Sequence, residues 1–298
     1  MPTSTTIEIA DLAKSFGPVR AVDGLTFTVN PGQVTGFLGP NGAGKTTTLR
    51  MLLGLVRPSS GSATFGGVEY RDLPRPLETV GTALEASSFH PGRSARNHLW
   101  VYALAAGIPQ SRVDEVLAQV GIAEFADRRV GGYSLGMRQR LGLAFALLGD
   151  PGVLVLDEPV NGLDPEGIKW IRSFLRQLAA EGRTVLVSSH LLSEVQQSVD
   201  RVVIISHGAL VYEGGLAELE GGPRVIVDAP DRTALASALG AAGATVEETP
   251  AGLAVTGLSP ERVGAIASTA GVALRHLAAE QTGIEKAFLE LVGEGGQL

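Results

Sequence analysis

Residues 39–47 read Gly39-Pro40-Asn41-Gly42-Ala43-Gly44-Lys45-Thr46-Thr47. The run satisfies the pattern Gly-x-x-x-x-Gly-Lys-[Ser/Thr] of a phosphate-binding loop, or P-loop. The apolar run 34–38 before it predicts a strand and the run 47–53 after it predicts a helix, which is the context that such a loop requires. A glycine-rich turn without a ligand is the alternative, and the order strand, loop, helix argues against it.

The chemistry of this loop follows from its residue types. Gly39, Gly42 and Gly44 leave the backbone free to curl, so that successive N–H groups point inward and bind an anion. The N-terminus of the following helix adds a partial positive charge. We expect Lys45 to reach the β- and γ-phosphates of ATP and the Thr46 hydroxyl to bind Mg²⁺. The whole run from Gly39 to Thr47 is therefore predicted to bind nucleotide.

A second candidate cluster begins with the apolar run 153–156, which ends in Asp157 and Glu158. An unbroken apolar run is typical of a strand buried on both faces of a parallel sheet. Asp157, at the carboxyl end of this strand, is predicted to bind Mg²⁺, and Glu158 to polarise the attacking water as a general base. An ordinary acidic turn is the alternative, which the P-loop upstream makes the weaker interpretation.

Between the two clusters the chain reads Tyr133-Ser134-Leu135-Gly136-Met137-Arg138-Gln139-Arg140. Here it resembles the ATP-binding cassette (ABC) family, whose signature usually reads Leu-Ser-Gly-Gly-Gln. The resemblance implies that Ser134 and Gly136 meet the γ-phosphate of ATP. Three positions depart from the pattern: Tyr133, Leu135 and Met137. This variant is similar to that of bacterial ATPases of the bacitracin and lantibiotic exporters. A helix that begins at Ser134 as its N-cap is a compatible interpretation.

Other family positions follow in order. Asp164 ends the run 161–164, which matches the D-loop, and the resemblance implies a place for it in the nucleotide site. His190 directly follows the apolar run 184–189, where the family keeps its switch histidine. Phe16 occupies the position of the aromatic residue that stacks on adenine, and a core aromatic residue is the alternative there.

One family position differs. The glutamine of the family's Q-loop is expected after a strand near residues 80–85, but the chain has no glutamine there. Glu85 is the residue that we expect at this position. Its carboxylate oxygens suit a hard cation, so Glu85 is a candidate Mg²⁺ ligand together with Thr46 and Asp157. An exposed loop glutamate without this role is the alternative.

The composition narrows the function classes. The chain has 298 residues, of which 44% are hydrophobic, and it contains no cysteine. We find no apolar run near the roughly 18–20 residues needed to cross a bilayer and no secretory signal at the start. We therefore expect a cytoplasmic protein that reaches the inner face of the membrane through permease subunits. A net charge of −7 argues against direct binding of nucleic acid.

The expected fold class is α/β, a P-loop NTPase of the ABC ATPase type with a small C-terminal α+β appendix. Residues 1–220 are expected to form the ATPase domain, with an N-terminal β layer and a helical subdomain at about 86–150. Residues 223–298 are expected to form a ferredoxin-like βαββαβ domain. We expect its last strand at 272–277 and a final helix at 282–291, which packs on its own domain or binds a partner.

The resemblance also implies partners. In the ABC family the nucleotide lies between the P-loop of one cassette and the signature of another, and this chain carries one of each. A second copy of the chain is therefore the expected partner, together with separate transmembrane permease subunits. The expected function is to power an export-type transporter of drugs, antibiotics or peptides. A soluble ABC ATPase of DNA repair or translation is the alternative. ABC ATPases of DNA repair carry a long coiled coil, and those of translation carry two cassettes in one chain.

Overall fold

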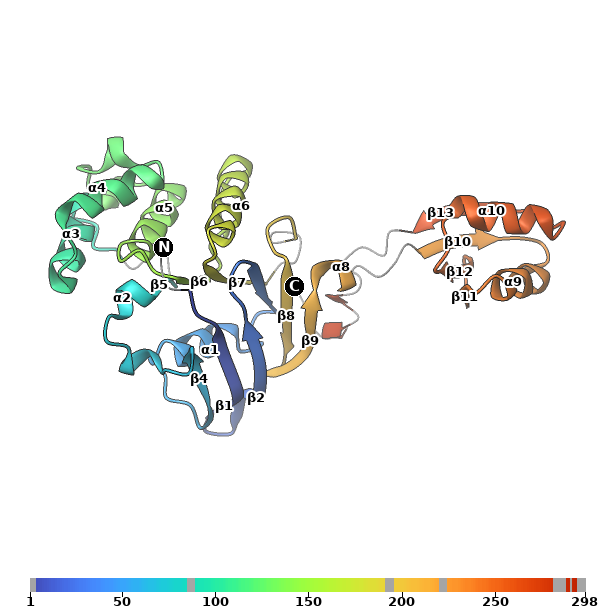
Figure 1. Ribbon diagram of the computed structural model, residues 1–298, viewed down its shortest axis with the longest axis horizontal. Helices are drawn as coiled ribbons and strands as arrows, with labels where there is room; N and C mark the ends of the chain where they lie inside the picture. The colour runs from blue at the N-terminus through green and yellow to red at the C-terminus, as the bar shows by residue number, and fades with distance from the viewer. Residues whose placement is uncertain are drawn as a thin grey trace. The chain divides into compact units, whose positions relative to one another are not determined.

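The computed structural model describes residues 4–84, 89–190, 196–219, 224–280, 288–289 and 291–293. The chain divides into two compact units. The first comprises Met1–Leu216 with Leu291–Leu298, and the second comprises Ala217–Glu290. The described residues of the first unit form two sheets and those of the second form one, and each unit has its own hydrophobic core. Figure 1 shows their elements.

The central sheet of the first unit has six strands in the order β5-β6-β7-β3-β8-β9. Their bounds are β3 Val34–Leu38, β5 Val80–Ala83, β6 Val153–Asp157, β7 Thr184–Ser189, β8 Arg201–Ser206 and β9 Ala209–Gly215. All neighbours run parallel except β8 and β9, which form an antiparallel hairpin. Parallel strands end at one edge of a sheet, so the segments after β3, β6 and β7 meet there.

A smaller antiparallel sheet has the order β2-β1-β4, with bounds β1 Ile7–Phe16, β2 Val19–Val29 and β4 Ser60–Phe65. Helix α1 (Lys45–Leu52) contributes Leu49 and Leu52 to a core that contains residues of both sheets. The rings of Phe27 and Phe37 join the layers, with centroids 5.3 Å apart. This packing fixes the start of α1, where the P-loop ends.

Three helices of the first unit, drawn in green in Figure 1, lie together on one side of the sheet. They are α3 Ala95–Ala106, α4 Gln110–Gln119 and α5 Leu135–Ala146. Helix α6 (Pro165–Ala180) connects β6 to β7. Short elements complete the unit: η1 Tyr70–Asp72, α2 Pro76–Thr79, η2 Ala123–Phe125 and η3 Val130–Gly132. The short helix α8 (Leu216–Leu219) begins at the last residue of this part of the first unit and continues into the second.

The second unit is an antiparallel sheet with two helices. Its elements are β10 Arg224–Asp228, α9 Arg232–Ala241, β11 Thr245–Thr249, β12 Gly252–Thr256, α10 Pro260–Thr269 and β13 His276–Glu280. The strand order is β11-β12-β10-β13, and every neighbouring pair is antiparallel. A βαββαβ chain in this strand order has the topology of a ferredoxin-like fold.

The last strand of this unit differs from the prediction of residues 272–277. Val272 lies just past α10 and closes the end of that helix, because its N–H donates to the carbonyl of Ala267. Strand β13 begins at His276, opposite Asp228, where its partner β10 ends. The register with β10 therefore decides where β13 starts, which local sequence does not reveal. The predicted helix 282–291 lies almost entirely outside the described residues.

Candidate functional site: a nucleotide-binding edge

The P-loop joins β3 to α1 in a backbone conformation that requires glycine at several positions. Gly42 and Gly44 have φ angles of 79° and 105°, in the left-handed region that favours glycine. Gly44 is the N-cap of α1, and no side chain caps this helix. The first amides of α1 are therefore available to an anion. At Gly39 a Cβ atom would collide with the backbone oxygen of Ile205, so only glycine fits.

Lys45 lies inside this loop and is 7% exposed. Its Nζ donates to the carbonyl of Gly39 at 2.5 Å and to that of Pro40 at 3.2 Å. Burial lowers the pKa of Lys45, while the carboxylates of Glu158 and Asp157 act in the opposite direction. A buried ammonium group next to a loop of free amides can donate to phosphate oxygens that enter the loop.

Asp157 ends β6 beside the P-loop. Its Oδ2 accepts a hydrogen bond of 3.1 Å from Thr46 Oγ1, and its Oδ1 accepts one from Ser188 Oγ. Ser188 lies opposite Asp157 in the parallel register of β6 and β7. No role is predicted for Ser188 from the sequence. It is the next-to-last residue of the buried strand β7, and pairing this strand in parallel with β6 would have placed Ser188 opposite Asp157. The structure thus brings Thr46 and Asp157 together.

Glu158 follows Asp157 with a φ of 48°, an uncommon angle for a residue other than glycine. The backbone N–H of Glu158 donates a hydrogen bond of 3.0 Å to Ser188 Oγ. The Glu158 side chain reaches His190, with Oε2 and Nδ1 2.9 Å apart. Burial raises the pKa of Glu158, and His190 and Lys45 partly offset this effect. A carboxylate with a raised pKa in a cleft is typical of a general base.

A cavity of about 460 Å³ lies at this edge of the sheet. The residues that line it come from the P-loop, from the segments after β6 and β7, and from β2: Ala21, Asn41, Gly42, Gly44, Lys45, Thr46, Thr47, Glu158, Asn161 and His190. The cavity therefore joins most of the predicted P-loop residues to Glu158, the candidate general base, and to His190, the candidate switch histidine. Asn161, in the D-loop, also lines it, whereas Asp164, the residue of that loop that we expect in the nucleotide site, does not.

The signature residues line a different cavity. Ser134 is the N-cap of α5, and its Oγ accepts a hydrogen bond of 3.2 Å from Met137 N–H. Asp164 caps α6 in the same way by accepting from Gly167 N–H at 2.8 Å. Ser134, Gly136 and Asp164 line a cavity of about 310 Å³. No described residue lines both this cavity and the P-loop cavity, so the signature and the P-loop line separate cavities.

Phe16 is 51% exposed at the end of β1, which excludes the alternative of a core aromatic residue. The ammonium of Lys14 lies 5.0 Å from the centroid of the Phe16 ring. Phe16 does not line the P-loop cavity. Its exposed face remains a candidate surface for stacking on a base.

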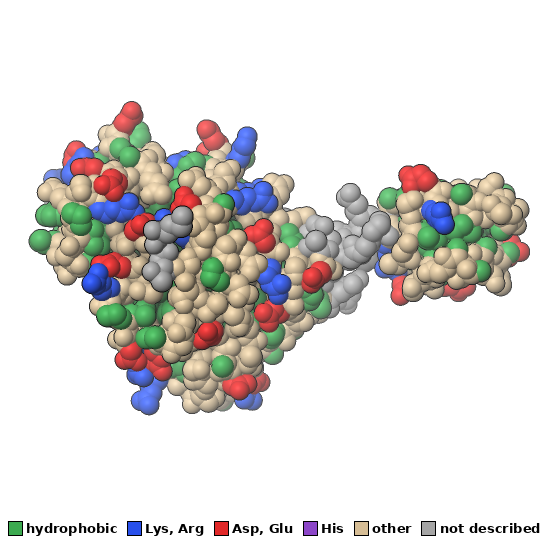
Figure 2. Space-filling view, viewed as in Figure 1, with side chains coloured by type: hydrophobic (Ala, Val, Ile, Leu, Met, Phe, Trp, Pro, Cys, Tyr) green, Lys and Arg blue, Asp and Glu red, His purple; other side chains and the backbone are tan. Residues whose placement is uncertain are grey.

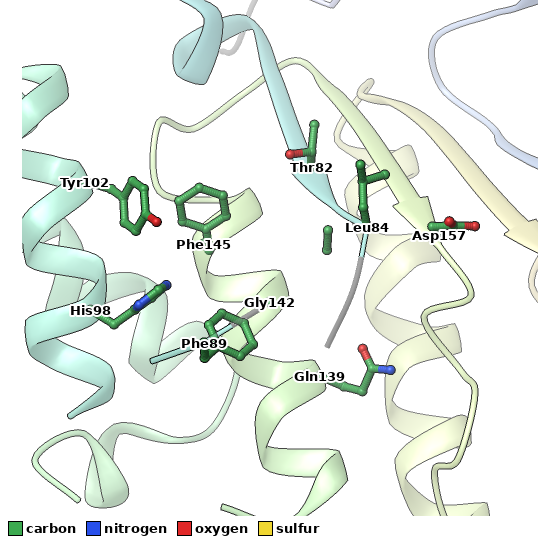
Figure 3. Close-up of a pocket in the computed structure, with 10 residues that line it drawn as sticks. Thr82, Leu84, Phe89, His98, Tyr102, Gln139, Gly142, Phe145 and Asp157 are labelled. Atoms are coloured by element: carbon green, nitrogen blue, oxygen red, sulfur yellow. The ribbon is translucent and has the colours of Figure 1, made fainter. Parts of the chain in front are cut away.

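Figure 3 shows a third cavity, of about 180 Å³, between the end of β5 and helices α3 and α5. Asp157 lies on one side of it, and His98, Tyr102 and Phe145 lie on the other. Burial lowers the pKa of His98, whose Nδ1 has no hydrogen-bond partner in the part of the chain that the structure describes. Leu84, the residue before Glu85, also lines the cavity. Glu85 itself lies outside the described residues.

The residues present fit a magnesium ion of the kind that nucleotides bring. Mg²⁺ is usually held by one or two carboxylates and by phosphate oxygens rather than by a complete protein cage. Thr46 and Asp157 supply a hydroxyl and a carboxylate next to the cavity. The described residues contain no group of three or more His, Cys, Asp and Glu side chains that could hold a metal without such help.

The described helices include none that is both long and apolar enough to span a bilayer. On the face of each unit shown in Figure 2, acidic and basic side chains are interspersed. The surface of the nucleotide-binding unit is therefore one of mixed charge where it can be seen.

Known proteins with similar sequences are ATP-binding proteins of ABC transporters, which agrees with a nucleotide site at this position. The family described as "ABC transporter" matches residues 22–161, and a "Domain of unknown function" matches residues 223–285. The bacitracin transport ATP-binding protein BcrA of Bacillus licheniformis is 46% identical over 213 residues, which are 70% of each chain. The lantibiotic transport ATP-binding protein SrtF of Streptococcus pyogenes is 37% identical, covering 70% of this chain and 90% of SrtF.

Among solved structures, cbiO1 of Clostridium perfringens, part of an ABC transporter complex, has a TM-score of 0.65 at 26% identity. The match covers 73% of this chain and 91% of that one. The family resemblance inferred from the signature, the fold class and the ATPase assignment are confirmed by these matches. The chain belongs to the ATP-binding proteins of ABC transporters, which hydrolyse ATP to power transport.

Proposed function

We propose that this chain is the ATPase subunit of an export-type ABC transporter and that two copies close around ATP to drive it. The observation that supports this proposal best is the separation of the two half-sites. The P-loop cavity and the signature cavity share no described residue. A nucleotide that needs both therefore requires two chains, and a symmetric dimer supplies both sites.

The residues have distinct roles in this proposal. The P-loop amides and Lys45 bind the phosphates, and Lys45 exchanges its bonds to Gly39 and Pro40 for phosphate oxygens. Glu158 takes a proton from the attacking water as general base. His190 contacts the Glu158 carboxylate at 2.9 Å and lines the P-loop cavity, and in this proposal it also donates to the γ-phosphate. Ser134 and Gly136 of the second copy meet the γ-phosphate from the other side.

Thr46 and Asp157 hold Mg²⁺ in this proposal, and Glu85 is a further candidate. When bound, the ion neutralises charge that develops on the phosphate oxygens. Without nucleotide, Thr46 donates to Asp157 directly. This hydrogen bond holds Thr46 Oγ1 and Asp157 Oδ2 next to each other beside the cavity. Ser188 holds the same carboxylate by donating to Asp157 Oδ1.

Phe16 stacks on the adenine in this proposal, since it is exposed and its ring already attracts the Lys14 ammonium. The energy of closure comes from ATP, because only a ligand that binds the closed dimer better than the open one shifts the population. Hydrolysis removes the γ-phosphate that both copies hold, and the dimer opens.

The transported molecule is proposed by analogy. BcrA is named for bacitracin transport and SrtF for lantibiotic transport, so peptide antibiotics or drugs are the cargo class that we propose. Separate permease subunits cross the membrane and bring this chain to its inner face. The soluble alternative in DNA repair is not favoured, because the longest described helices between P-loop and signature, α3 and α4, have only 12 and 10 residues.

An affinity experiment tests the transporter assignment. Tagged Glu158→Gln protein, which we expect to bind ATP and hydrolyse it slowly, is recovered from detergent-solubilised membranes of the source cells in the presence of ATP. We expect a multi-spanning protein in a fixed ratio to the ATPase. Recovery of ribosomes, DNA or soluble partners alone would contradict the transporter assignment and leave the ATPase assignment intact.

A further inference from the structure

We propose that Tyr133 is a positioning residue that holds the signature serine, Ser134, ready for the nucleotide of the second copy. The proposal rests on the proposed dimer and explains why the chain has tyrosine where the ABC signature usually begins with leucine. The evidence is the contrast between the two neighbours: Tyr133 is 4% exposed, whereas Ser134 is exposed.

The Tyr133 side chain is bound at its far end. Its hydroxyl donates to the carbonyl of Phe125 at 2.6 Å, which lies in the short turn η2 before the signature. Burial raises the pKa of Tyr133, so the hydroxyl keeps its proton and remains a donor at neutral pH. Leucine at this position could fill the same space but could not make this bond.

The backbone before Tyr133 is fixed on another side. Val130 N–H donates to the carbonyl of Arg93 and Gly131 N–H donates to that of Pro91, both at 2.9 Å. Gly131 lies so close that a Cβ atom there would be 3.0 Å from the Pro91 oxygen. The segment that leads into α5 is thus attached to residues 91–93 by its backbone and to η2 by the Tyr133 hydroxyl.

These attachments act on Ser134 because it directly follows Tyr133 and begins α5. A serine that must present its hydroxyl and the first amides of a helix to a phosphate works best when it is held in place beforehand. Ser134 already directs its Oγ to the Met137 amide. Loss of the Tyr133 hydroxyl should loosen this start of the helix and make the closed dimer harder to form.

Tyr133→Phe is a clean test, because it keeps the ring and removes only the donor. The Phe125 carbonyl also accepts from Arg128 N–H at 3.0 Å, so the substitution leaves no unpaired carbonyl. Tyr70→Phe is the matched control: Tyr70 packs edge-on against Phe65, in another part of the same unit. Both variants are made with and without Glu158→Gln.

Two measurements are made on the full chain. The first is hydrogen exchange of backbone amides without nucleotide. In Tyr133→Phe the amides of residues 130–137 should exchange faster, whereas exchange in α1 should not change. The second is ATP-driven dimerisation in the Glu158→Gln background. We expect it to weaken about fivefold for each of the two sites, the usual effect of losing one hydrogen bond, while the ATP affinity of the monomer stays the same. Tyr70→Phe should change neither.

Unchanged exchange at residues 130–137 would overturn the proposal, because Tyr133 would then hold nothing in place. Faster exchange with unchanged dimerisation would also overturn it, because the bond would serve stability alone. If Glu158→Gln with Tyr133 intact fails to dimerise with ATP, the proposed dimer fails. The claim that Tyr133 orders Ser134 is then still decided by exchange, whereas its role in closure falls with the dimer.

Discussion

Glu158 and His190, from the segments after two neighbouring strands, lie with Oε2 and Nδ1 2.9 Å apart. Burial raises the pKa of Glu158, and His190 lowers it both by this hydrogen bond and by its charge. Each residue is about three-quarters buried, with side chains 23% and 28% exposed. The pair therefore links the candidate general base to the candidate switch histidine before any nucleotide binds.

We predict that Glu158→Gln slows ATP hydrolysis at least ~100-fold, which is the usual contribution of a general base. The amide has almost the same shape, so ATP should still bind. Steady-state phosphate release and equilibrium binding of ATP measure the two effects. The control is Glu124→Gln, an exposed glutamate of η2. An unchanged turnover number would remove Glu158 from the mechanism.

We predict that the pH profile of hydrolysis reports the Glu158–His190 pair. A protonated glutamate cannot act as a base, so the rate falls as pH falls through the pKa of Glu158. Because burial raises this pKa, the acid limb should lie above the ordinary glutamate value of 4.5. His190→Ala removes an influence that lowers the pKa and should move the limb to still higher pH.

The measurement is the turnover number at saturating ATP as a function of pH. His276→Ala, in the second unit, is the control and should leave the limb where it is. A limb that stays in place in His190→Ala, or that moves to lower pH, would show that the contact does not govern the ionisation of Glu158.

We predict that Lys45→Ala weakens ATP binding about tenfold or more, since a charge-assisted hydrogen bond to phosphate is lost. The same change removes a buried ammonium whose pKa is lowered by burial, so the empty protein need not lose stability. Calorimetry of ATP binding and thermal unfolding check both parts. Lys169→Ala, on the exposed face of α6, is the control. Equal ATP affinity in Lys45→Ala would contradict the P-loop assignment.

We predict that Phe16→Ala weakens ATP binding roughly fivefold to a hundredfold, the range measured for a base stacked on an aromatic ring. Phe16→Tyr should bind like the unchanged protein, because it keeps the ring. The effect should be similar for GTP, since every base has a face on which to stack. Leu55→Ala, which removes another exposed apolar side chain, serves as control. An affinity that does not change would leave Phe16 without a role in the site.

The strongest sequence predictions concern elements with a local signal. The P-loop needs glycine at fixed spacings, and the structure places left-handed angles at Gly42 and Gly44. The apolar runs that end in Asp157 and Ser189 form neighbouring parallel strands. A strand whose two faces are both apolar is stable only when both faces are buried, as they are in a parallel sheet covered by helices. The helix start at Ser134 follows from the side chain that caps it.

Other features depend on contacts between distant segments and were missed for that reason. Ser188 becomes part of the site only through the register of β6 and β7. Tyr133 was recognised as a departure from the signature, but its bond to Phe125 is tertiary. The start of β13 depends on where β10 ends. Whether Glu85 replaces the Q-loop glutamine stays a prediction, since Glu85 lies outside the described residues.

The central claim is that the P-loop of one copy and Ser134 of another hold the same ATP. The most direct measurement is the molar mass of Glu158→Gln in solution, by light scattering, with ATP and with ADP. Asp caps helices about as well as Ser, so Ser134→Asp keeps α5 but places a negative charge where the γ-phosphate is expected. Ser94→Asp makes the same exchange at the N-cap of α3 and is the control.

We predict about twice the chain mass of 30.9 kDa with ATP and the single mass with ADP. Adding Ser134→Asp should keep the protein monomeric with ATP bound, whereas adding Ser94→Asp should leave the dimer intact. A monomer under every condition, or an ATP-dependent dimer that Ser134→Asp does not weaken, would contradict the shared site.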